Sequence, residues 1–95
     1  MSPELEKHIL EKLAEDGASS QEAFATLCKE LQRPLLNVCF HITGNQDDAK
    51  DAVQETLIAI HRQLSTFRRD ASLTTWAFQI AIRIAVRIGS LRTRT

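Results

Sequence analysis

Residues 72–91, which read SLTTWAFQIAIRIAVRIGSL, give the clearest indication of the fold. At about 100° of rotation per residue, one broad face of this stretch carries only apolar side chains and should pack inward. That face consists of Leu73, Ala77, Ile80, Ala81, Ile84, Ala85 and Ile88. Ser72 is a suitable N-cap residue. The stretch therefore predicts a largely buried α-helix over about Leu73–Leu91.

A neighbouring face of the same helix combines an aromatic ring with cations. Trp76, Arg83 and Arg87 share with Ser72 and Gln79 a sector of roughly 80°. Arginines neutralise phosphates, and an aromatic ring stacks on exposed bases, so this face favours nucleic-acid binding. Periodicity alone leaves open a second interpretation, a solvated face with Trp76 half-buried against the core.

The preceding sequence is also helical in its spacing. Three amphipathic helices are expected, at about Pro3–Glu15, Ser20–Thr43 and Asp48–Leu64. Pro34 lies inside the second and should kink it, or divide it into two shorter helices. No alternating run is long enough for a strand. We therefore expect an all-α, compact bundle of about four helices with a kink or break near Pro34. It should form a single domain overall, with an N-terminal helix and linker in 1–19 and the main domain in 20–95.

Turn residues and apolar positions give further detail around the third helix. Gly44 should adopt the left-handed conformation that ends the second helix, and Asn45 or Asp47 should cap the third. Its expected inward residues are Ala52, Val53, Leu57, Ile60 and Leu64. Ile82 and Val86 lie on yet another side of the last helix, so its apolar surface is too wide to face one core. Packing of the first helix or of a protein partner would cover these two residues.

The neutral net charge conceals two oppositely charged halves. Residues 1–60 hold five Lys or Arg against eleven Asp or Glu, a net charge of −6, whereas residues 61–95 hold seven Arg against one Asp, a net charge of +6. This asymmetry suggests one acidic and one basic surface with different partners, and nucleic acid is the usual partner of a basic surface.

Several function classes find no support. No Gly-rich phosphate loop, Ser-His-Asp set or pair of carboxylates is present, so we expect no enzymatic activity and no cofactor. Cys28 and Cys39 are expected to be reduced, buried thiols. A metal site formed by them with His41 and His61 is conceivable, but the spacing is not compact. Because neither a long apolar run nor a signal peptide is present, no membrane span is expected and the cytoplasm is the expected location.

Two linked motifs identify a resemblance. Residues 47–67, DDAKDAVQETLIAIHRQLSTF, and residues 67–81, FRRDASLTTWAFQIA, resemble the D-A-x-D-x-V-Q-E-T-F and F-R-x-x-S-x-x-x-W-L-x-x-I-A segments of bacterial extracytoplasmic-function (ECF) sigma factors. The similarity covers about residues 21–94 and lies in region 2 of that family. It implies a helical module for transcription initiation that docks on core RNA polymerase and recognises and melts the minus-ten promoter element.

The resemblance also implies site residues. The V-Q-E helix of the family binds the clamp helices of the largest polymerase subunit, and here the matching residues are Asp51, Gln54, Glu55, Leu57 and His61. The loop and the last helix of the family bind the non-template strand of the minus-ten element, with a flipped base held by the loop. The residues assigned to DNA binding are Phe67, Arg68, Arg69, Asp70, Ser72, Thr75, Trp76, Gln79, Arg83 and Arg87.

The resemblance leaves alternatives open. Arg83 stands where many relatives have an asparagine, so the promoter preference cannot be copied from relatives and weakened melting is an open alternative. The family carries a second DNA-binding domain after region 2, and we therefore expect the sequence to be an excised domain rather than a natural one-domain protein. An alternative function is a sigma-like interaction domain that acts mainly through an anti-sigma factor or another regulator, with weak or no promoter melting. A third is a generic helical DNA-binding module that prefers duplex DNA.

Overall fold

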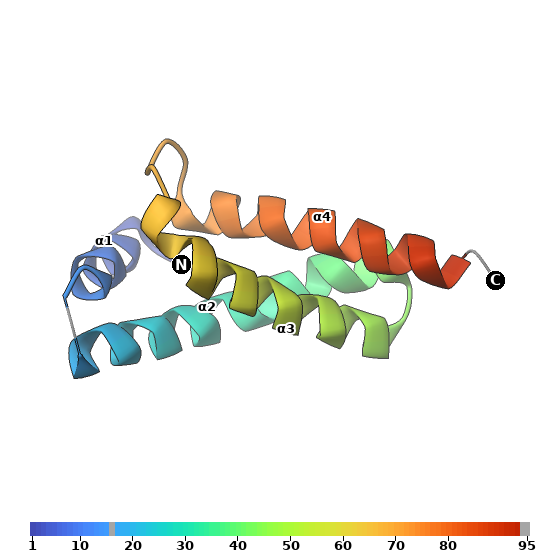
Figure 1. Ribbon diagram of the computed structural model, residues 1–95, viewed down its shortest axis with the longest axis horizontal. Helices are drawn as coiled ribbons and strands as arrows, with labels where there is room; N and C mark the ends of the chain where they lie inside the picture. Colours follow the sequence, from blue (N-terminus) through green and yellow to red (C-terminus); the bar gives the residue numbers. More distant parts are fainter. Residues whose placement is uncertain (16, 94–95) are drawn as a thin grey trace. The chain divides into compact units, whose positions relative to one another are not determined.

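The computed structural model describes residues 1–15 and 17–93, and in this part of the chain every regular element is a helix. The elements are the α-helices α1 (Pro3–Leu13), α2 (Ala18–Thr43), α3 (Gln46–Gln63) and α4 (Leu73–Thr93), with the 3₁₀ turn η1 (Leu64–Thr66) after α3 (Figure 1). The expected all-α class is confirmed. Within the described ranges, no helix has the length and apolar character needed to cross a membrane.

The helices begin and end at residues whose chemistry suits those positions. The backbone N–H of Asp48 donates to Oδ1 of Asn45 at 2.9 Å, so Asn45 rather than Asp47 is the N-cap residue of α3. Gly44 has a φ angle of 67°, the left-handed conformation expected at the end of α2. Ser2 caps α1 by accepting the N–H of Leu5.

The chain divides into two compact units, Met1–Gln32 and Arg33–Thr95. The first unit holds α1 and the first part of α2, and its buried apolar side chains are Ile9, Ala23, Leu27 and Leu31. The helix α2 continues without interruption through Pro34, so the alternative of two shorter helices is wrong. Burial of Leu31, Leu35 and Cys39 on one stripe accounts for this continuity. The domain boundary after residue 19 stays a prediction.

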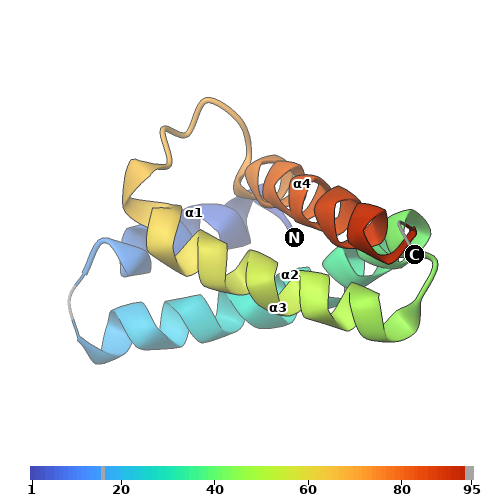
Figure 2. The same ribbon diagram turned by 45° about the vertical axis from the view of Figure 1, so that its right-hand side comes forward.

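In the second unit, α3 and α4 lie side by side (Figures 1 and 2). The shared core is rich in alanine, which allows the helices to approach closely: Leu35, Cys39, Ala49, Ala52, Val53, Thr56, Ile60, Leu73, Ala77, Ile80, Ala81 and Ala85 are buried. The end of α4 meets the end of α2, since a Cβ built on Gly89 would lie 3.7 Å from the carbonyl oxygen of Ile42. This packing holds one long face of α4 against the core and leaves the others accessible.

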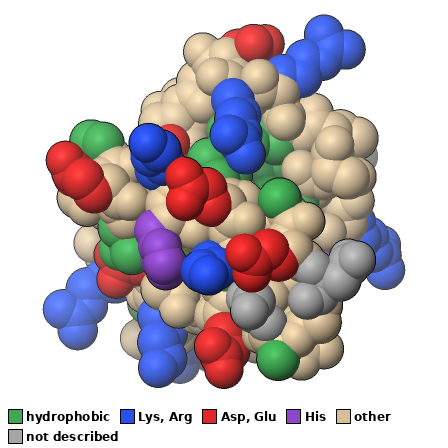
Figure 3. All heavy atoms as spheres, turned by 90° about the vertical axis from the view of Figure 1, so that its left-hand side faces the viewer, with side chains coloured by type: hydrophobic (Ala, Val, Ile, Leu, Met, Phe, Trp, Pro, Cys, Tyr) green, Lys and Arg blue, Asp and Glu red, His purple; other side chains and the backbone are tan. Residues whose placement is uncertain are grey.

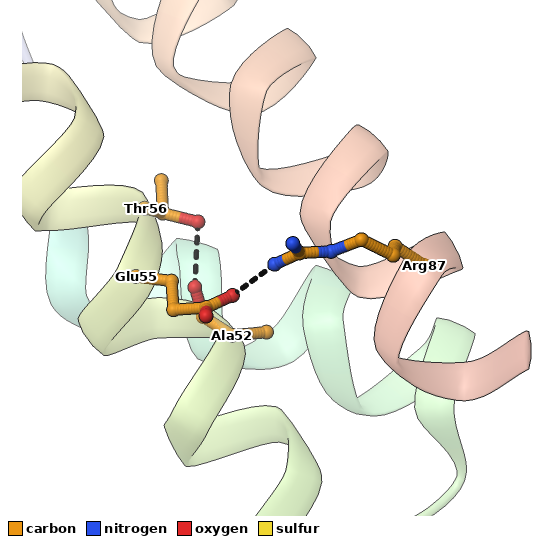
Figure 4. Close-up of polar contacts among 4 residues, drawn as sticks. All are labelled: Ala52, Glu55, Thr56 and Arg87. Carbon is orange, nitrogen blue, oxygen red and sulfur yellow. Dashed lines mark hydrogen bonds and ion pairs between the residues drawn. The ribbon is translucent and has the colours of Figure 1, made fainter. Parts of the chain in front are cut away.

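Helical periodicity predicts most of these inward positions. On α4, five of the seven expected residues are buried, whereas Ile84 and Ile88 are half-buried. Of the inward residues expected for the third helix, Leu57 on α3 and Leu64 in η1 are half-buried. Thr56 is fully buried instead, and its hydroxyl donates to the carbonyl oxygen of Ala52 at 2.6 Å (Figure 4). This local acceptor satisfies the hydroxyl, which would otherwise be buried without a hydrogen bond.

Candidate functional site

The loop between η1 and α4 is anchored by an aromatic pair. The rings of Phe67 and Trp76 lie with their centroids 4.9 Å apart and their planes inclined by 37°, and both side chains are half-buried. Such tilted pairs add about 0.5–1.5 kcal/mol beyond the burial of their surface. Two of the residues assigned to DNA binding are therefore in contact with each other, and their role stays a prediction.

The remainder of the loop is exposed and locally strained. Arg68, Arg69 and Asp70 point three charged side chains to the surface. Arg69 has a φ angle of 62°, a left-handed conformation that costs a residue with a Cβ roughly 1–2 kcal/mol. Strained backbone of this kind is concentrated at functional sites. The loop that follows Phe67 therefore exposes two arginines, one of them on strained backbone.

Ser72 and Thr75 form the start of α4. The Oγ of Ser72 accepts the backbone N–H of Thr75 at 3.1 Å and donates to the Thr75 hydroxyl at 2.9 Å. Ser72 is therefore the predicted N-cap. The two hydroxyls, both assigned to DNA binding, lie together at the positive end of the helix dipole. Farther along α4, Gln79, Arg83 and Arg87 are exposed, so these polar assigned residues all reach the surface.

The surface of α3 carries the other assigned set. Asp51, Gln54, Glu55 and His61 are exposed, and Leu57 is half-buried. Ile58 lies among them and is 50% exposed, although it was not among the assigned residues. A signal was present in the sequence: Ile58 comes three residues after Glu55 and four after Gln54, which puts it on the same helical face. An apolar side chain is thus exposed within the acidic surface of α3.

The two assigned sets meet at one ion pair. A guanidinium nitrogen of Arg87 on α4 donates to Oε2 of Glu55 on α3 (Figure 4). Both side chains remain largely exposed. The acidic set of α3 and the basic set of α4 are therefore neighbours across the helix pair. Figure 3 shows one face of the molecule with its side chains coloured by type, and both acidic and basic side chains are exposed there.

An open groove of 620 Å³ follows the line where α3 and α4 meet. Its lining combines three arginines and one glutamate with apolar side chains: Glu55, Ile58, Ala59, Arg62, Gln63, Arg83, Ile84 and Arg87. We name it the α3–α4 groove. Arg62 was not assigned to either site from the sequence, although helical periodicity predicts that it faces solvent or a partner. Only the packing of the two helices brings it near Arg83 and Arg87.

The two cysteines are free thiols. Cys39 is buried and Cys28 is half-buried, and burial raises the pKa of both thiols above the ordinary range. Among the described residues, no group of three or more His, Cys, Asp and Glu side chains is arranged to hold a metal ion.

Comparison with known proteins relates this geometry to a family. Residues 27–95 match the family described as Sigma-70 region 2. The chain is 31% identical over 85 residues to the ECF RNA polymerase sigma-E factor of Salmonella typhimurium, covering 90% of the chain and 43% of the relative. It is 30% identical over 77 residues to the ECF RNA polymerase sigma factor SigM of Mycobacterium tuberculosis, covering 81% of the chain and 39% of the relative.

A more distant relative supports the same assignment. The ECF RNA polymerase sigma factor SigW of Bacillus subtilis is 23% identical over 82 residues, covering 86% of the chain and 44% of the relative. The chain thus spans less than half the length of these three relatives. No solved structure matches it significantly. The match over residues 27–95 and these relatives establish that the chain belongs to the sigma-70 region 2 family, as region 2 of an ECF sigma factor.

Proposed function

We propose that this region 2 module docks on the clamp helices of the largest subunit of core RNA polymerase and holds the melted non-template strand of the minus-ten promoter element. Sigma factors are transcription initiation factors and not enzymes, so the module acts by binding alone. Its site of action would be the bacterial cytoplasm, where polymerase and promoters are found.

The arrangement of one face carries the proposal for DNA. Phe67 and Trp76 form a half-buried aromatic pair at the two ends of the arginine-bearing loop, and Arg83 and Arg87 lie farther along α4. Stacking on one base contributes about 1–3 kcal/mol, and backbone contacts add a salt-dependent share. Unstacking a base costs a few kcal/mol. A domain that melts promoter DNA without ATP hydrolysis therefore needs both base stacking and backbone contacts.

The exposed face of α3 supports polymerase docking. Asp51 and Glu55 offer carboxylates on a rigid helix, where charge-assisted hydrogen bonds to a basic partner fix the register. Ile58, exposed between them and His61, adds an apolar contact of the kind found at the centre of protein interfaces. Both docking and DNA binding would then be served by adjoining surfaces of α3 and α4.

Fluorescence anisotropy with a labelled single-stranded minus-ten oligonucleotide tests the DNA face. We expect Trp76→Ala and Arg83→Ala to weaken binding at low salt, while Arg33→Ala, an exposed arginine on α2, leaves it unchanged. Equal binding by all variants would remove the assigned face. A preference for duplex over single strand would favour a generic DNA-binding module instead.

Retention on immobilised polymerase clamp helices tests the docking face. The parent should be retained, and the double variant Gln54→Ala/Glu55→Ala should not be. Lys50→Ala, which removes an exposed cation from the same helix, is the control for nonspecific charge effects.

One observation favours a second candidate function. Ile82 and Val86 are 42% and 50% exposed, on a side of α4 that does not face the core. A regulator such as an anti-sigma factor would bury this pair while it covers the neighbouring polymerase and DNA faces. If regulator binding is the main function, the parent should bind neither the clamp helices nor the oligonucleotide.

A further inference from the structure

We infer that Phe67 is a positioning residue and not itself a contact to DNA. By packing on Trp76 it closes the loop of residues 67–76 and holds the loop arginines in one conformation before the strand arrives. The inference rests on the proposed DNA-binding function and deepens it, because it leaves Trp76 to meet a base and gives Phe67 an indirect role.

The middle of this loop has no polar contacts that would hold it. Residues 68–71 are exposed, and within the described ranges none of them forms a hydrogen bond or an ion pair. The backbone N–H of Phe67 donates to the carbonyl oxygen of Leu64 at 3.2 Å, and that of Trp76 to the carbonyl oxygen of Ser72 at 3.0 Å. Each of these bonds lies at one end of the loop, so neither joins the two ends.

The two rings do join the ends. Phe67 is the first residue after η1, Trp76 lies in the first turn of α4, and their ring centroids are 4.9 Å apart. A contact between the two ends of a flexible segment restricts the conformations open to everything between them. The Phe67–Trp76 contact therefore limits the freedom of Arg68 and Arg69.

The backbone of Arg69 indicates that the closed loop imposes its own conformation. Its φ angle of 62° is one that a residue with a Cβ adopts only where its surroundings require it. The stabilisation from an aromatic pair is of the same order as the cost of one left-handed residue, so the ring contact is strong enough to balance this strain. Without the Phe67 ring, Arg69 should relax and the loop should open.

A loop that is closed in advance favours binding. The strand then meets Arg68 and Arg69 without having to order the chain that carries them, and this ordering otherwise lowers affinity. Loss of the Phe67 ring should therefore weaken DNA binding even though the ring itself makes no contact with the strand.

Limited digestion of the full chain with trypsin tests the closed loop without DNA. Cleavage after Arg68, followed by mass spectrometry, should be roughly two- to tenfold faster in Phe67→Ala than in the parent, and Phe67→Tyr should restore the parent rate. Val53→Ala, a substitution in the core of α3, is the control for global destabilisation. It should speed cleavage after Lys50 on α3 but not after Arg68, because local opening of the loop does not require unfolding.

A double-mutant cycle in DNA binding tests the indirect role. Anisotropy with a labelled single-stranded minus-ten oligonucleotide should show binding roughly two- to tenfold weaker in Phe67→Ala and unchanged in Phe67→Tyr. In a Trp76→Ala background, where the ring contact is already lost, Phe67→Ala should weaken binding no further. Phe40→Ala, which removes a ring that is 46% exposed on α2, should bind like the parent, and circular dichroism checks that all variants fold.

The outcomes separate the positioning role from DNA binding as such. If the effects of Phe67→Ala and Trp76→Ala on affinity add, Phe67 contacts the strand itself, so the inference is overturned while the DNA face stands. The inference is also overturned if cleavage after Arg68 is unchanged in Phe67→Ala, or rises equally in Val53→Ala. If the parent fails to bind the oligonucleotide at all, the proposed function falls and the positioning role falls with it.

Discussion

Arg87 on α4 and Glu55 on α3, thirty-two positions apart in the chain, are joined by an ion pair. One residue belongs to the set assigned to DNA and the other to the set assigned to polymerase. Because both side chains are about half-exposed, at 60% and 48%, the pair contributes little to folding, in the range of about 0–1 kcal/mol. Its main consequence is that a residue assigned to DNA binding is paired with a residue assigned to polymerase docking.

We predict that Glu55→Gln strengthens binding of single-stranded DNA while it weakens docking on the clamp helices. The substitution releases the Arg87 guanidinium and removes a carboxylate that repels phosphate, so affinity at low salt should rise roughly two- to fivefold. Anisotropy measures the first effect and retention on clamp helices the second.

A matched control separates the ion pair from net charge. Asp51→Asn removes the same charge one turn earlier on α3, and in the described part of the chain Asp51 forms no ion pair with Arg87. The gain should be smaller in Asp51→Asn and absent when Glu55→Gln is combined with Arg87→Gln. Equal gains in the two carboxylate variants would contradict the role of the pair.

Helical periodicity predicts those features of the fold that depend on a single helix. The spacing of apolar residues gives the start of α4 at Leu73, its inward face and the position of Ile82 and Val86 away from the core, because these depend on one helix only. It also contains the burial of Thr56, which lies one turn from Ala52 and Ile60, but the polar residue type conceals it.

Relations between helices have no such local signal. The Glu55–Arg87 pair and the place of Arg62 in the α3–α4 groove depend on the register of α3 against α4, which is set by the packing of alanines such as Ala52 and Ala81. The left-handed backbone of Arg69 is equally hidden, since arginine rarely adopts it and the surrounding loop imposes it.

The contact between Phe67 and Trp76 leads to a second prediction. Phe67→Ala should lower the free energy of unfolding by about 1–2 kcal/mol, through loss of the ring contact and of buried apolar surface. It should also shift the emission of Trp76, the only tryptophan, to longer wavelength as its ring becomes more exposed. Urea titration followed by fluorescence gives both values.

Two control variants test whether the effect comes from the contact between the two rings: one removes a different phenylalanine ring, and the other replaces Phe67 by an aliphatic residue. Phe40→Ala removes a ring that is 46% exposed and should leave the emission maximum in place. Phe67→Leu should retain more of the stability than Phe67→Ala but not the ring contact. An unchanged emission maximum in Phe67→Ala would argue against the contact in solution.

The backbone of Arg69 gives a third prediction, in which stability and binding change in opposite directions. Arg69→Asn should raise the free energy of unfolding by up to about 1 kcal/mol, because asparagine tolerates a positive φ, while the lost cation weakens DNA binding. Arg68→Asn, the adjacent exposed arginine, should weaken binding without the gain in stability. Thermal unfolding and anisotropy measure the two effects, and a gain in stability in both variants would show that relief of charge repulsion, not of backbone strain, is the cause.

Burial of the thiols gives a fourth prediction, on pH dependence. Burial raises the pKa of Cys28 and of Cys39, so the folded chain keeps these protons at a pH where the unfolded chain has lost them. The resulting stability is fully present below the unfolded pKa of about 8.5 and is lost as the pH rises through the raised pKa of the folded state. Urea titrations at pH 7 and pH 9.5 should therefore show a fall in the free energy of unfolding that is smaller in Cys28→Ser/Cys39→Ala.

In the folded parent, a thiol reagent should react first with half-buried Cys28 and then with buried Cys39, both more slowly than in the urea-unfolded chain. Reaction of the folded thiols as fast as the unfolded ones would contradict the raised pKa values.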